Sequence, residues 1–526
     1  MQLYNRRTFL KTVGLDVAAL ALFGCAGPYQ GNHPKKQNSK PNIVFILADD
    51  LGYGDLRCYN PESKVPTPNL DKLAEEGMRF TDAHSSSTVC TPTRYSLLTG
   101  RMAFRTGKGG VFTGAGGPCL IEQERLTLPQ MLKNQGYATA CFGKWHVGLT
   151  FFNKNGEPIH RGGLEAVKQI DYSRPITDGP INRGFDQFFG TACCPTTDWL
   201  YAYIDGDRIP VPPTGILNRD PLPKHPYSRD NRRGMIAPDF DLEEVDLVFL
   251  EKSKKFLEQH VKSNPDQPFF LFHSAQAVHL PSFPADRFKG KTNAGPHGDF
   301  IFENDYIVGE LMKTIQRLGL ADNTLVIFSS DNGPEVTTTI NMRDDYKHDA
   351  ARPWRGMKRD QWEGGHRVPF IARWPGKIKP GSTSSQMISL TDVMATCAAI
   401  VRAELPENAA EDSYNILPVL RGKQGDKPIR KYLLQQTISL ALSIRRGPRK
   451  LLDHKGSGGN RYERNPRLKK YIIKDTAPDA PGQLYNLDSD PGETINLYFQ
   501  QPEIVKELKN QLEKYKSSGR SAPSRI

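Results

Sequence analysis

One cysteine, Cys90, directly precedes a short predicted helix in the segment CTPTRYSLLTGR. Pro92 suits the first position of that helix and Gly100 suits its end, so we expect the thiol just outside the helix N-terminus. Backbone N–H groups and the helix dipole favour an anionic ligand there, and Arg94 adds a positive charge in the first turn. The pattern predicts an anion-binding site whose thiol is a nucleophile, a metal ligand or half of a disulfide.

Four oxygen-bearing side chains follow two apolar runs, residues 43–47 and 325–328, each typical of a strand buried on both faces of a parallel sheet. They are Asp49, Asp50, Asp331 and Asn332. One such pair could cap a helix or form a turn, but two pairs at two strand ends favour a metal site. Oxygen ligands without an accompanying histidine favour a hard divalent cation, and we expect one calcium ion.

Basic side chains occupy comparable positions elsewhere in the chain. Lys144 and His146 follow a predicted strand at residues 137–142, and His279 follows another. Lys358 lies in a loop that glycines interrupt. Each of them alone would more often be a packing or surface residue, but beside a metal and an anion site they become candidates for charge neutralisation and proton transfer.

The predicted strands alternate with amphipathic segments, among them residues 67–80 and 127–137, in which apolar side chains recur at helical spacing. This alternation predicts an α/β fold with a parallel sheet. Because ligands collect at the carboxyl ends of parallel strands, the polar residues should converge on one site although they are far apart in the sequence.

The composition is that of a globular protein, with 526 residues of which 37% are hydrophobic and 24% are charged. The net charge of +12 favours anionic partners. The sequence contains no recognisable nucleic-acid-binding module, so we expect no nucleic acid among these partners.

The first 24 residues have the pattern of an export signal. Arg6 and Arg7 begin a twin-arginine motif, and a short apolar run leads to Cys25. This pattern is typical of a bacterial lipoprotein, in which Cys25 would be lipidated and would tether the protein to a membrane. A plain cleaved signal and an uncleaved anchor are the alternative interpretations. Residues 25–40 would form a linker. A periplasmic or cell-surface location would permit disulfides, but their pairing cannot be deduced from the sequence.

Several longer motifs resemble those of the type I sulfatases, members of the alkaline-phosphatase-like superfamily. Residues 90–94 have the pattern C-x-P-x-R, and YSLLTGR continues it. GKWHVG, GFDQFFG, SSDNGP, WEGGHRVPFIARWPG and QLYNLDSDPGETINL follow in the order of that family. The resemblance implies a catalytic domain, residues 41–425, with a large, mostly parallel mixed sheet sandwiched by helices. It also implies a smaller C-terminal α+β domain, residues 426–526.

The resemblance further implies the chemistry. Cys90 would be oxidised to formylglycine by a formylglycine-generating enzyme; one hydroxyl of the aldehyde hydrate attacks sulfur, and the other later expels the sulfate. Arg94 and Lys144 would hold the diol and sulfate oxygens. The ligands of the calcium ion would be Asp49, Asp50, Asp331, Asn332 and the modified Cys90.

The remaining basic residues would act around the sulfate. His146 would assist release of the sulfated intermediate, His279 would be the general acid, and Lys358 would lie near the leaving oxygen and the sulfate. A dianionic, crowded transition state needs this fixed positive charge more than it needs a strong base.

The predicted activity is hydrolysis of a sulfate ester, and export together with a basic surface favours a sulfated carbohydrate or polysaccharide as the substrate. A phosphodiester or phosphonate monoester hydrolase of the same superfamily is the alternative, since it can share the formylglycine motif. An inactive surface lipoprotein that only binds sulfated glycans is a third interpretation, but it would leave the complete series of motifs unexplained.

Two local features allow two interpretations each. His366 stands where the family usually has an aliphatic residue. It is either a packing variation or a substrate contact. The segment 461–471 is rich in arginine and lysine. It is either a solvated loop or a subsite for further anionic groups of a polymer, bound by Arg464, Arg467 and Lys469.

Overall fold

The computed structural model describes residues 40–524, and the predicted α/β fold is confirmed. The export signal, Cys25 and the predicted linker up to residue 39 lie outside the described residues. Between residues 40 and 524, no helix is both long and apolar enough to cross a bilayer. All seven cysteines in this range are free thiols.

Within the described residues, one large sheet contains nine strands. From one edge to the other they are β15 (Ser382–Ser384), β2 (Met78–Phe80), β14 (Phe370–Arg373), β13 (Thr324–Ser330), β1 (Asn42–Ala48), β12 (Phe269–Ser274), β4 (Ala138–Lys144), β7 (Gln187–Thr191) and β9 (Ile204–Asp205). The strands from β13 to β7 run parallel, whereas β14 and β9 pair antiparallel on either side of them. The four apolar runs of the sequence are β1, β4, β12 and β13, and their side chains are almost entirely buried.

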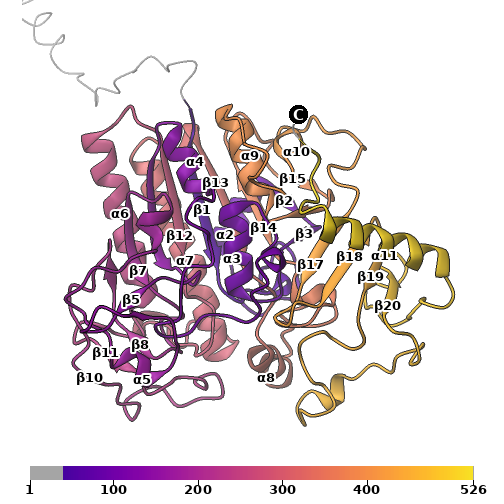
Figure 1. Ribbon diagram of the computed structural model, residues 1–526, viewed down its shortest axis with the longest axis horizontal. Helices are drawn as coiled ribbons and strands as arrows, with labels where there is room; N and C mark the ends of the chain where they lie inside the picture. Colours follow the sequence, from indigo (N-terminus) through magenta and orange to yellow (C-terminus); the bar gives the residue numbers. More distant parts are fainter. Residues whose placement is uncertain (1–39, 525–526) are drawn as a thin grey trace, which may run out of the picture. The chain divides into compact units, whose positions relative to one another are not determined.

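Two groups of helices cover the sheet (Figure 1). In the first group, α2 (Pro68–Glu75) and α6 (Val245–Ser263) both contact α7 (Gly295–Arg317). In the second group, α3 (Cys90–Thr99), α4 (Leu128–Asn134) and α9 (Asp392–Val401) contact one another. The sheet lies between the two groups, which explains why its central strands are apolar on both faces.

A smaller antiparallel sheet follows, with the order β17 (Leu433–Gln436), β18 (Leu442–Arg446), β19 (Arg449–Leu452) and β20 (Gln483–Asn486). Helix α11 (Pro502–Ser517), yellow in Figure 1, packs on β18 and β19 around a separate small core. These elements match the expected C-terminal α+β architecture, while the domain boundary at residue 425 stays a prediction. The Gln436 N–H donates to the Ser86 carbonyl oxygen and the Gln436 carbonyl oxygen accepts from the Thr88 N–H, which joins this sheet to the segment before Cys90.

The remaining strands and α-helices of the described residues lie outside the two larger sheets and the helices named above. They are β3 (Ala83–His84), β5 (Phe151–Phe152), β6 (Pro158–Ile159), β8 (Leu200–Tyr201), β10 (Gly215–Ile216), β11 (Met235–Ile236), β16 (Ile388–Ser389), α5 (Leu164–Val167), α8 (Val336–Tyr346) and α10 (Leu417–Leu420).

Candidate active site

Cys90 is the first residue of α3, not a residue just outside it as the sequence suggested. Val89 precedes the helix with an extended backbone, and Pro92 fits in the first turn because N–H groups there have no partner within the helix. Gly100 ends the helix with a φ of 66°, as predicted. The buried thiol therefore lies at the positive end of α3.

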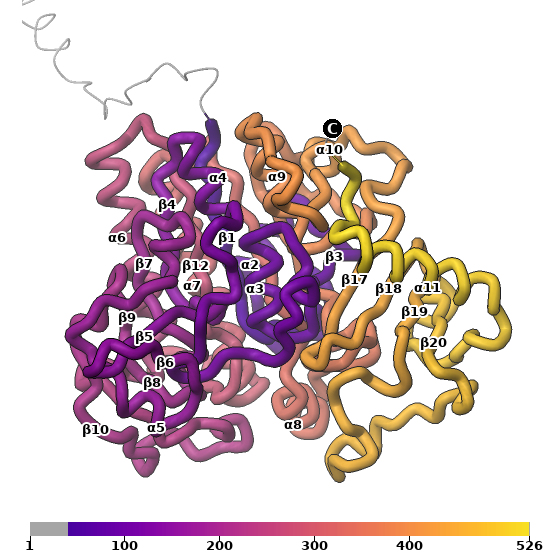
Figure 2. Tube along the Cα trace, viewed as in Figure 1, coloured from indigo at the N-terminus to yellow at the C-terminus, as the bar shows by residue number. Residues whose placement is uncertain are grey.

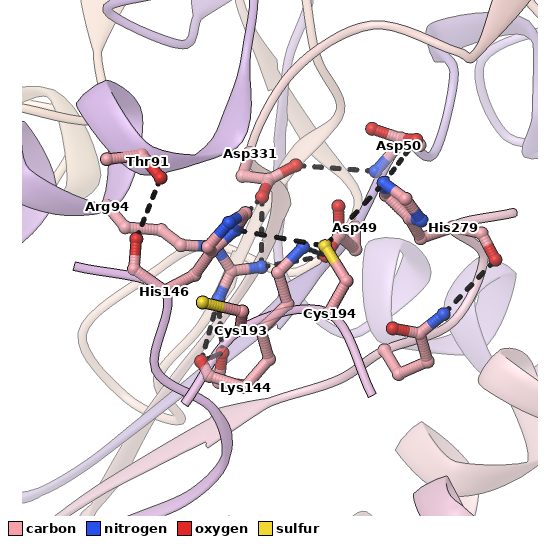
Figure 3. Close-up of polar contacts among 12 residues, drawn as sticks. Asp49, Asp50, Thr91, Arg94, Lys144, His146, Cys193, Cys194, His279 and Asp331 are labelled. Atoms are coloured by element: carbon pink, nitrogen blue, oxygen red, sulfur yellow. Dashed lines mark hydrogen bonds and ion pairs between the residues drawn. The ribbon is translucent and has the colours of Figure 1, made fainter. Parts of the chain in front are cut away.

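The polar residues that follow different strands converge, as the sequence predicts (Figure 3). Asp49 and Asp50 follow β1, and Asp331 and Asn332 follow the neighbouring strand β13. Asn332 Nδ2 donates to Asp50 Oδ1 at 2.7 Å, and Asp331 Oδ1 accepts from the Asp50 N–H at 3.3 Å. All four residues are buried.

Arg94 joins α3 to four strand ends. Its Nε donates to Asp331 Oδ2 at 3.0 Å and its NH2 to Asp49 Oδ2 at 3.2 Å. Its NH1 donates to Ser274 Oγ at 2.6 Å and to the carbonyl oxygen of Lys144 at 2.9 Å. Every nitrogen of this guanidinium has a protein partner, so direct contact with diol or sulfate oxygens stays a prediction.

Two buried lysines pair with the two acids that follow β1. Lys144 Nζ forms an ion pair with Asp49 Oδ2. Lys358 Nζ lies 2.8 Å from the Asp50 carboxylate and 3.7 Å from Glu335 Oε2. Each aspartate is thus held by a lysine from a different part of the chain.

A cavity of about 200 Å³ has Cys90 in its wall. His146, His279 and Lys358 also line it, whereas the predicted residues Arg94 and Lys144 do not. The four predicted oxygen ligands are likewise absent from the lining. The site therefore has a layer that can touch a ligand and a buried layer that fixes charge around Cys90.

Cys194, to which the sequence analysis gave no role, lies between the two predicted histidines (Figure 3). Its Sγ is 4.0 Å from His146 Nδ1 and 3.9 Å from His279 Nε2, and it also contacts the thiol of Cys90. Cys194 lines the cavity as well. The one sequence signal for it is its position shortly after the motif GFDQFFG.

The other nitrogen of each histidine faces a carbonyl oxygen. His146 Nε2 lies 2.8 Å from the oxygen of Phe112, and His279 Nδ1 lies 2.5 Å from the oxygen of Leu280. Because a carbonyl oxygen only accepts, these nitrogens carry the hydrogen in the neutral rings. The lone pairs of His146 Nδ1 and His279 Nε2 are then directed toward Cys194.

Burial and neighbouring charges shift the pKa values of the acids in the buried layer. Burial, together with the charge of Asp49, raises the pKa of Asp50 and that of Asp331 to about 7. Burial also disfavours ionised Asp49, but Lys144 and other nearby cations hold the pKa of Asp49 below its usual value. Asp49 is therefore the acid that stays ionised most readily.

The pKa values of two groups that line the cavity, Cys90 and His279, are also shifted. The contact with Cys194 holds the pKa of Cys90 well below its usual value, and His146 adds to this effect while burial opposes it. Burial lowers the pKa of His279 to about 3, with a further contribution from Lys358. At neutral pH the site contains a thiolate-prone Cys90 beside a neutral His279.

Two residues of the site have an unusual backbone. Asp50 and His146 have φ values of 61° and 57°, in the left-handed region that residues other than glycine rarely adopt. Gly143, just before Lys144, allows β4 to approach β12: a Cβ atom there would lie 1.8 Å from the Ser274 carbonyl oxygen. These features aim the side chains that follow β1 and β4 at Cys90.

Oxygen atoms of the buried layer fit a hard cation. Asp49 Oδ1 and Asn332 Oδ1 are buried and have no hydrogen-bond partner among residues 40–524. The ligand atoms of Asp49, Cys90 and Asp331 lie within 4.8 Å of one another. Because buried polar atoms without partners are costly, this donor set suits a bound metal ion that prefers oxygen.

Sequence reasoning missed several charged residues of the cavity wall, among them Glu335 and Arg359. Arg359 NH1 donates to Glu335 Oε2 at 3.0 Å, and no motif in the sequence indicated this pair. His366, in contrast, is buried away from the cavity, with its Nδ1 3.0 Å from His84 Nδ1 and its Nε2 3.1 Å from Lys450 Nζ. The packing interpretation of His366 is therefore supported.

Comparison with known proteins agrees with this site. Residues 41–402 match the family model for sulfatases, and residues 356–518 match the model for the C-terminal part of N-sulphoglucosamine sulphohydrolase. Because the first match covers more than half of the chain, the protein belongs to the sulfatase family. It is a sulfuric ester hydrolase, and the family generally uses a formylglycine and a metal ion.

Individual relatives are similar over nearly the whole chain. An N-acetylgalactosamine-6-O-sulfatase of Bacteroides thetaiotaomicron is 34% identical over 94% of this chain and 97% of its own. Human arylsulfatase A is 33% identical over 89% of this chain and 86% of its own. A solved structure from Bacteroides thetaiotaomicron, described in terms of the metabolism of multiple glycosaminoglycans, is 31% identical with a TM-score of 0.75 and covers 91% of this chain and 100% of its own.

Proposed function

We propose that this sulfatase removes the 6-O-sulfate of an N-acetylgalactosamine unit in a sulfated glycan, with Cys90 converted to formylglycine and one calcium ion bound. The observation that carries this proposal is the position of Cys90: it lies at a helix N-terminus, lines one cavity with His146 and His279, and is close to carboxylate oxygens of Asp49 and Asp331. The 34% identical N-acetylgalactosamine-6-O-sulfatase supports the choice of sugar.

The size and polarity of the cavity support a single sulfated sugar as its occupant. Its volume of about 200 Å³ is below the roughly 300–1,000 Å³ of clefts that bind drug-sized ligands. Its wall contains Arg232 and Arg359 together with Asp198 and Asp230. Cations suit the sulfate, and carboxylates can accept hydrogen bonds from sugar hydroxyls.

Calcium is the proposed metal because the donor set is rich in oxygen. Its ligands would be Asp49, Asp50, Asp331, Asn332 and the modified Cys90. Bound there, the ion would supply Lewis-acid stabilisation of the negative charge that develops on the sulfate group. The hydrated aldehyde at residue 90 would supply one hydroxyl that attacks sulfur and a second that later expels sulfate.

The surrounding residues have distinct roles in this proposal. Lys358, in the cavity wall, offsets the charge of the bound sulfate. Arg94 and Lys144 fix Asp49 and hold positive charge behind residue 90. Because their side-chain nitrogens already have protein partners, they act on the sulfate through this charge.

The two histidines would move protons. His146 Nδ1 has a lone pair on the cavity side, so it can take a proton from the hydroxyl that expels the sulfate. His279 Nε2 must gain a proton before it can protonate the leaving oxygen, and the negative charge of a bound sulfate ester would favour that gain.

Sulfate release from three monosaccharides tests the substrate: N-acetylgalactosamine 6-sulfate, N-acetylgalactosamine 4-sulfate and N-acetylglucosamine 6-sulfate. We expect the highest kcat/KM for the first, and no release by a Cys90→Ala variant. Faster release from either of the other two would contradict the proposed position or the proposed sugar. Hydrolysis of a phosphonate monoester or a phosphodiester, measured as release of the alcohol, at a higher kcat/KM would contradict the proposed reaction.

We further propose that residues 1–24 export the protein and that Cys25 is lipidated, which would place the enzyme at the periplasmic or outer face of a bacterial membrane. A formylglycine-generating enzyme would act on the C-x-P-x-R segment before the protein folds, since Cys90 is buried in the folded chain. A Cys25→Ser variant that stays membrane-associated would contradict the lipid anchor.

A further inference from the structure

A second cavity, of about 790 Å³, lies in the C-terminal part of the chain and shares no lining residue with the cavity at Cys90. We call it the C-terminal cavity. Its wall comes mainly from the long segment between β19 and β20, which Figure 2 shows beside α8. Arg355 and Trp362, on either side of Lys358 in sequence, also line it, as do Gln483, Tyr485 and Thr494.

Cations predominate in this lining. Five basic residues face two acidic ones, namely Arg355, Lys455, Arg461, Arg464 and Lys474 against Glu463 and Asp475. Arg461, Arg464 and Lys474 are exposed, and no described residue provides any of these three with an ion pair or a side-chain hydrogen bond. Unpaired guanidinium and ammonium groups suit sulfate and carboxylate oxygens.

Aromatic rings form another part of the wall. Trp362, Tyr462, Tyr471 and Tyr485 all line the cavity. The Tyr462 hydroxyl donates to Asp360 Oδ2 at 2.6 Å, which fixes its ring 5.5 Å from that of Trp362. Aromatic faces beside unpaired cations suit a ligand that has both C–H surfaces and negative groups. A sulfated or uronic-acid-bearing saccharide has this combination.

Only one layer of residues separates the two cavities. Asn460 lines the C-terminal cavity, and its Nδ2 donates to the carbonyl oxygen of Lys358 at 2.9 Å while its Oδ1 accepts from Arg359 Nε at 3.1 Å. Lys358 and Arg359 line the cavity at Cys90. Gly459 packs so tightly here that a Cβ atom would lie 2.1 Å from the Arg359 carbonyl oxygen.

The structure also changes which residues of segment 461–471 can meet a ligand. Of the three residues named from the sequence, only Arg464 lines the C-terminal cavity. Arg467 bonds to Asn341 on α8, and Lys470 Nζ lies 2.6 Å from Asp344 on the same helix. These contacts hold the segment in place, with Arg461 and Arg464 lining the cavity.

We propose that the C-terminal cavity binds an anionic saccharide: a second, sulfated or uronic-acid-bearing part of the glycan whose terminal sulfate ester occupies the cavity at Cys90. The inference rests on the proposed function for the identity of the glycan. Arg461, Arg464 and Lys474 bind its negative groups, and the partly exposed rings of Tyr462 and Tyr471 contact its sugar faces. The site would make the enzyme prefer oligosaccharides to single sulfated sugars.

Calorimetric titration tests this with a full-length Cys90→Ala protein, which cannot turn the ligand over. The probes are a chondroitin 6-sulfate hexasaccharide and N-acetylgalactosamine 6-sulfate. Replacing Arg461, Arg464 and Lys474 together with glutamine should weaken hexasaccharide binding about tenfold more than monosaccharide binding. The matched control replaces the exposed Lys423, Lys506 and Lys514 with glutamine and should leave both dissociation constants at the parent values.

Equal losses for the two probes, equal hexasaccharide affinities of the two triple variants, or a loss caused by partial unfolding in circular dichroism would each overturn the proposal. The difference between the variants should also shrink at about 1 M salt, where exposed charges are screened. If the wild-type enzyme releases no sulfate from either probe but the triple variant still loses hexasaccharide affinity, the proposed substrate fails while the saccharide site stands.

Discussion

Arg94 and Asp331 form a fully buried ion pair in which Nε and NH2 of the guanidinium lie 3.0 Å and 2.9 Å from the same carboxylate oxygen, Oδ2. This pair fixes the start of α3 relative to the end of β13. Asp331 Oδ1 takes no part in this pair and accepts from the Asp50 N–H at 3.3 Å, beside the other oxygen ligands. The position of Cys90 and the geometry of the proposed calcium site therefore depend on the same contact.

Replacing Asp331 with asparagine should remove activity by loss of calcium. Asparagine keeps the shape of the side chain but removes the charge that a hard cation requires. We expect no detectable bound calcium in elemental analysis, no turnover, and circular dichroism like that of the wild type. Asp488→Asn at an exposed position is the control. An Asp331→Asn enzyme that retained both calcium and turnover would remove Asp331 from the ligand set.

Cys194 should matter through its polarity. Its sulfur contacts both His146 and His279, so valine would break these contacts while serine would keep a hydrogen-bonding group. We expect Cys194→Val to lower kcat about tenfold, the effect of losing roughly one hydrogen bond, and Cys194→Ser to retain most of it. Similar kcat values for the two variants would show that Cys194 only fills space.

A buried histidine in β12 should make stability depend on pH. Burial lowers the pKa of His273 from 6.5 to about 4. Between these values the unfolded chain binds a proton that the folded chain does not, so this contribution to stability is complete above pH 6.5 and is lost as the pH falls toward 4.

Urea unfolding at several pH values measures this effect. Relative to His273→Gln, the wild type should lose about 3 kcal/mol of unfolding free energy between pH 6.5 and pH 4. The exposed His160→Gln variant should follow the wild type across the range. The assignment fails if His273→Gln and the wild type have the same pH dependence.

Lys450 should be essential to a buried charge network that joins the C-terminal sheet to the catalytic part of the chain. Its Nζ lies 3.0 Å from Glu363 Oε1 and 2.9 Å from Glu493 Oε1, and all three side chains are buried. Lys450→Met would leave two buried carboxylates without their shared cation. We expect a loss of about 3–5 kcal/mol in unfolding free energy, against almost none for the exposed Lys506→Met. A loss below about 1 kcal/mol would mean that the carboxylates find other partners.

Much of the fold and site follows from local sequence patterns. The runs that became β1, β4, β12 and β13 are apolar throughout because helices cover both faces of the sheet, so they are recognisable without tertiary information. Parallel strands then bring their carboxyl ends together, which is why Asp49, Asp331 and Lys144 could be predicted to meet.

Other contacts depend on loop packing, which no local pattern encodes. Cys194 reaches His279 from the chain after β7, and Lys358 reaches Asp50 from a segment far along the sequence. The pairing of Arg467 with α8 similarly depends on where the segment between β19 and β20 packs. The start of α3 at Cys90 differed from the prediction because an extended residue can precede a proline-containing first turn at more than one position.

The central claim is that Cys90 acts as formylglycine, and mass spectrometry of the peptide that contains residue 90, prepared from active enzyme, tests it most directly. The account predicts that the peptide carries the aldehyde and that the modified fraction rises in proportion to kcat across preparations. Active enzyme in which residue 90 is entirely unmodified cysteine would contradict the account.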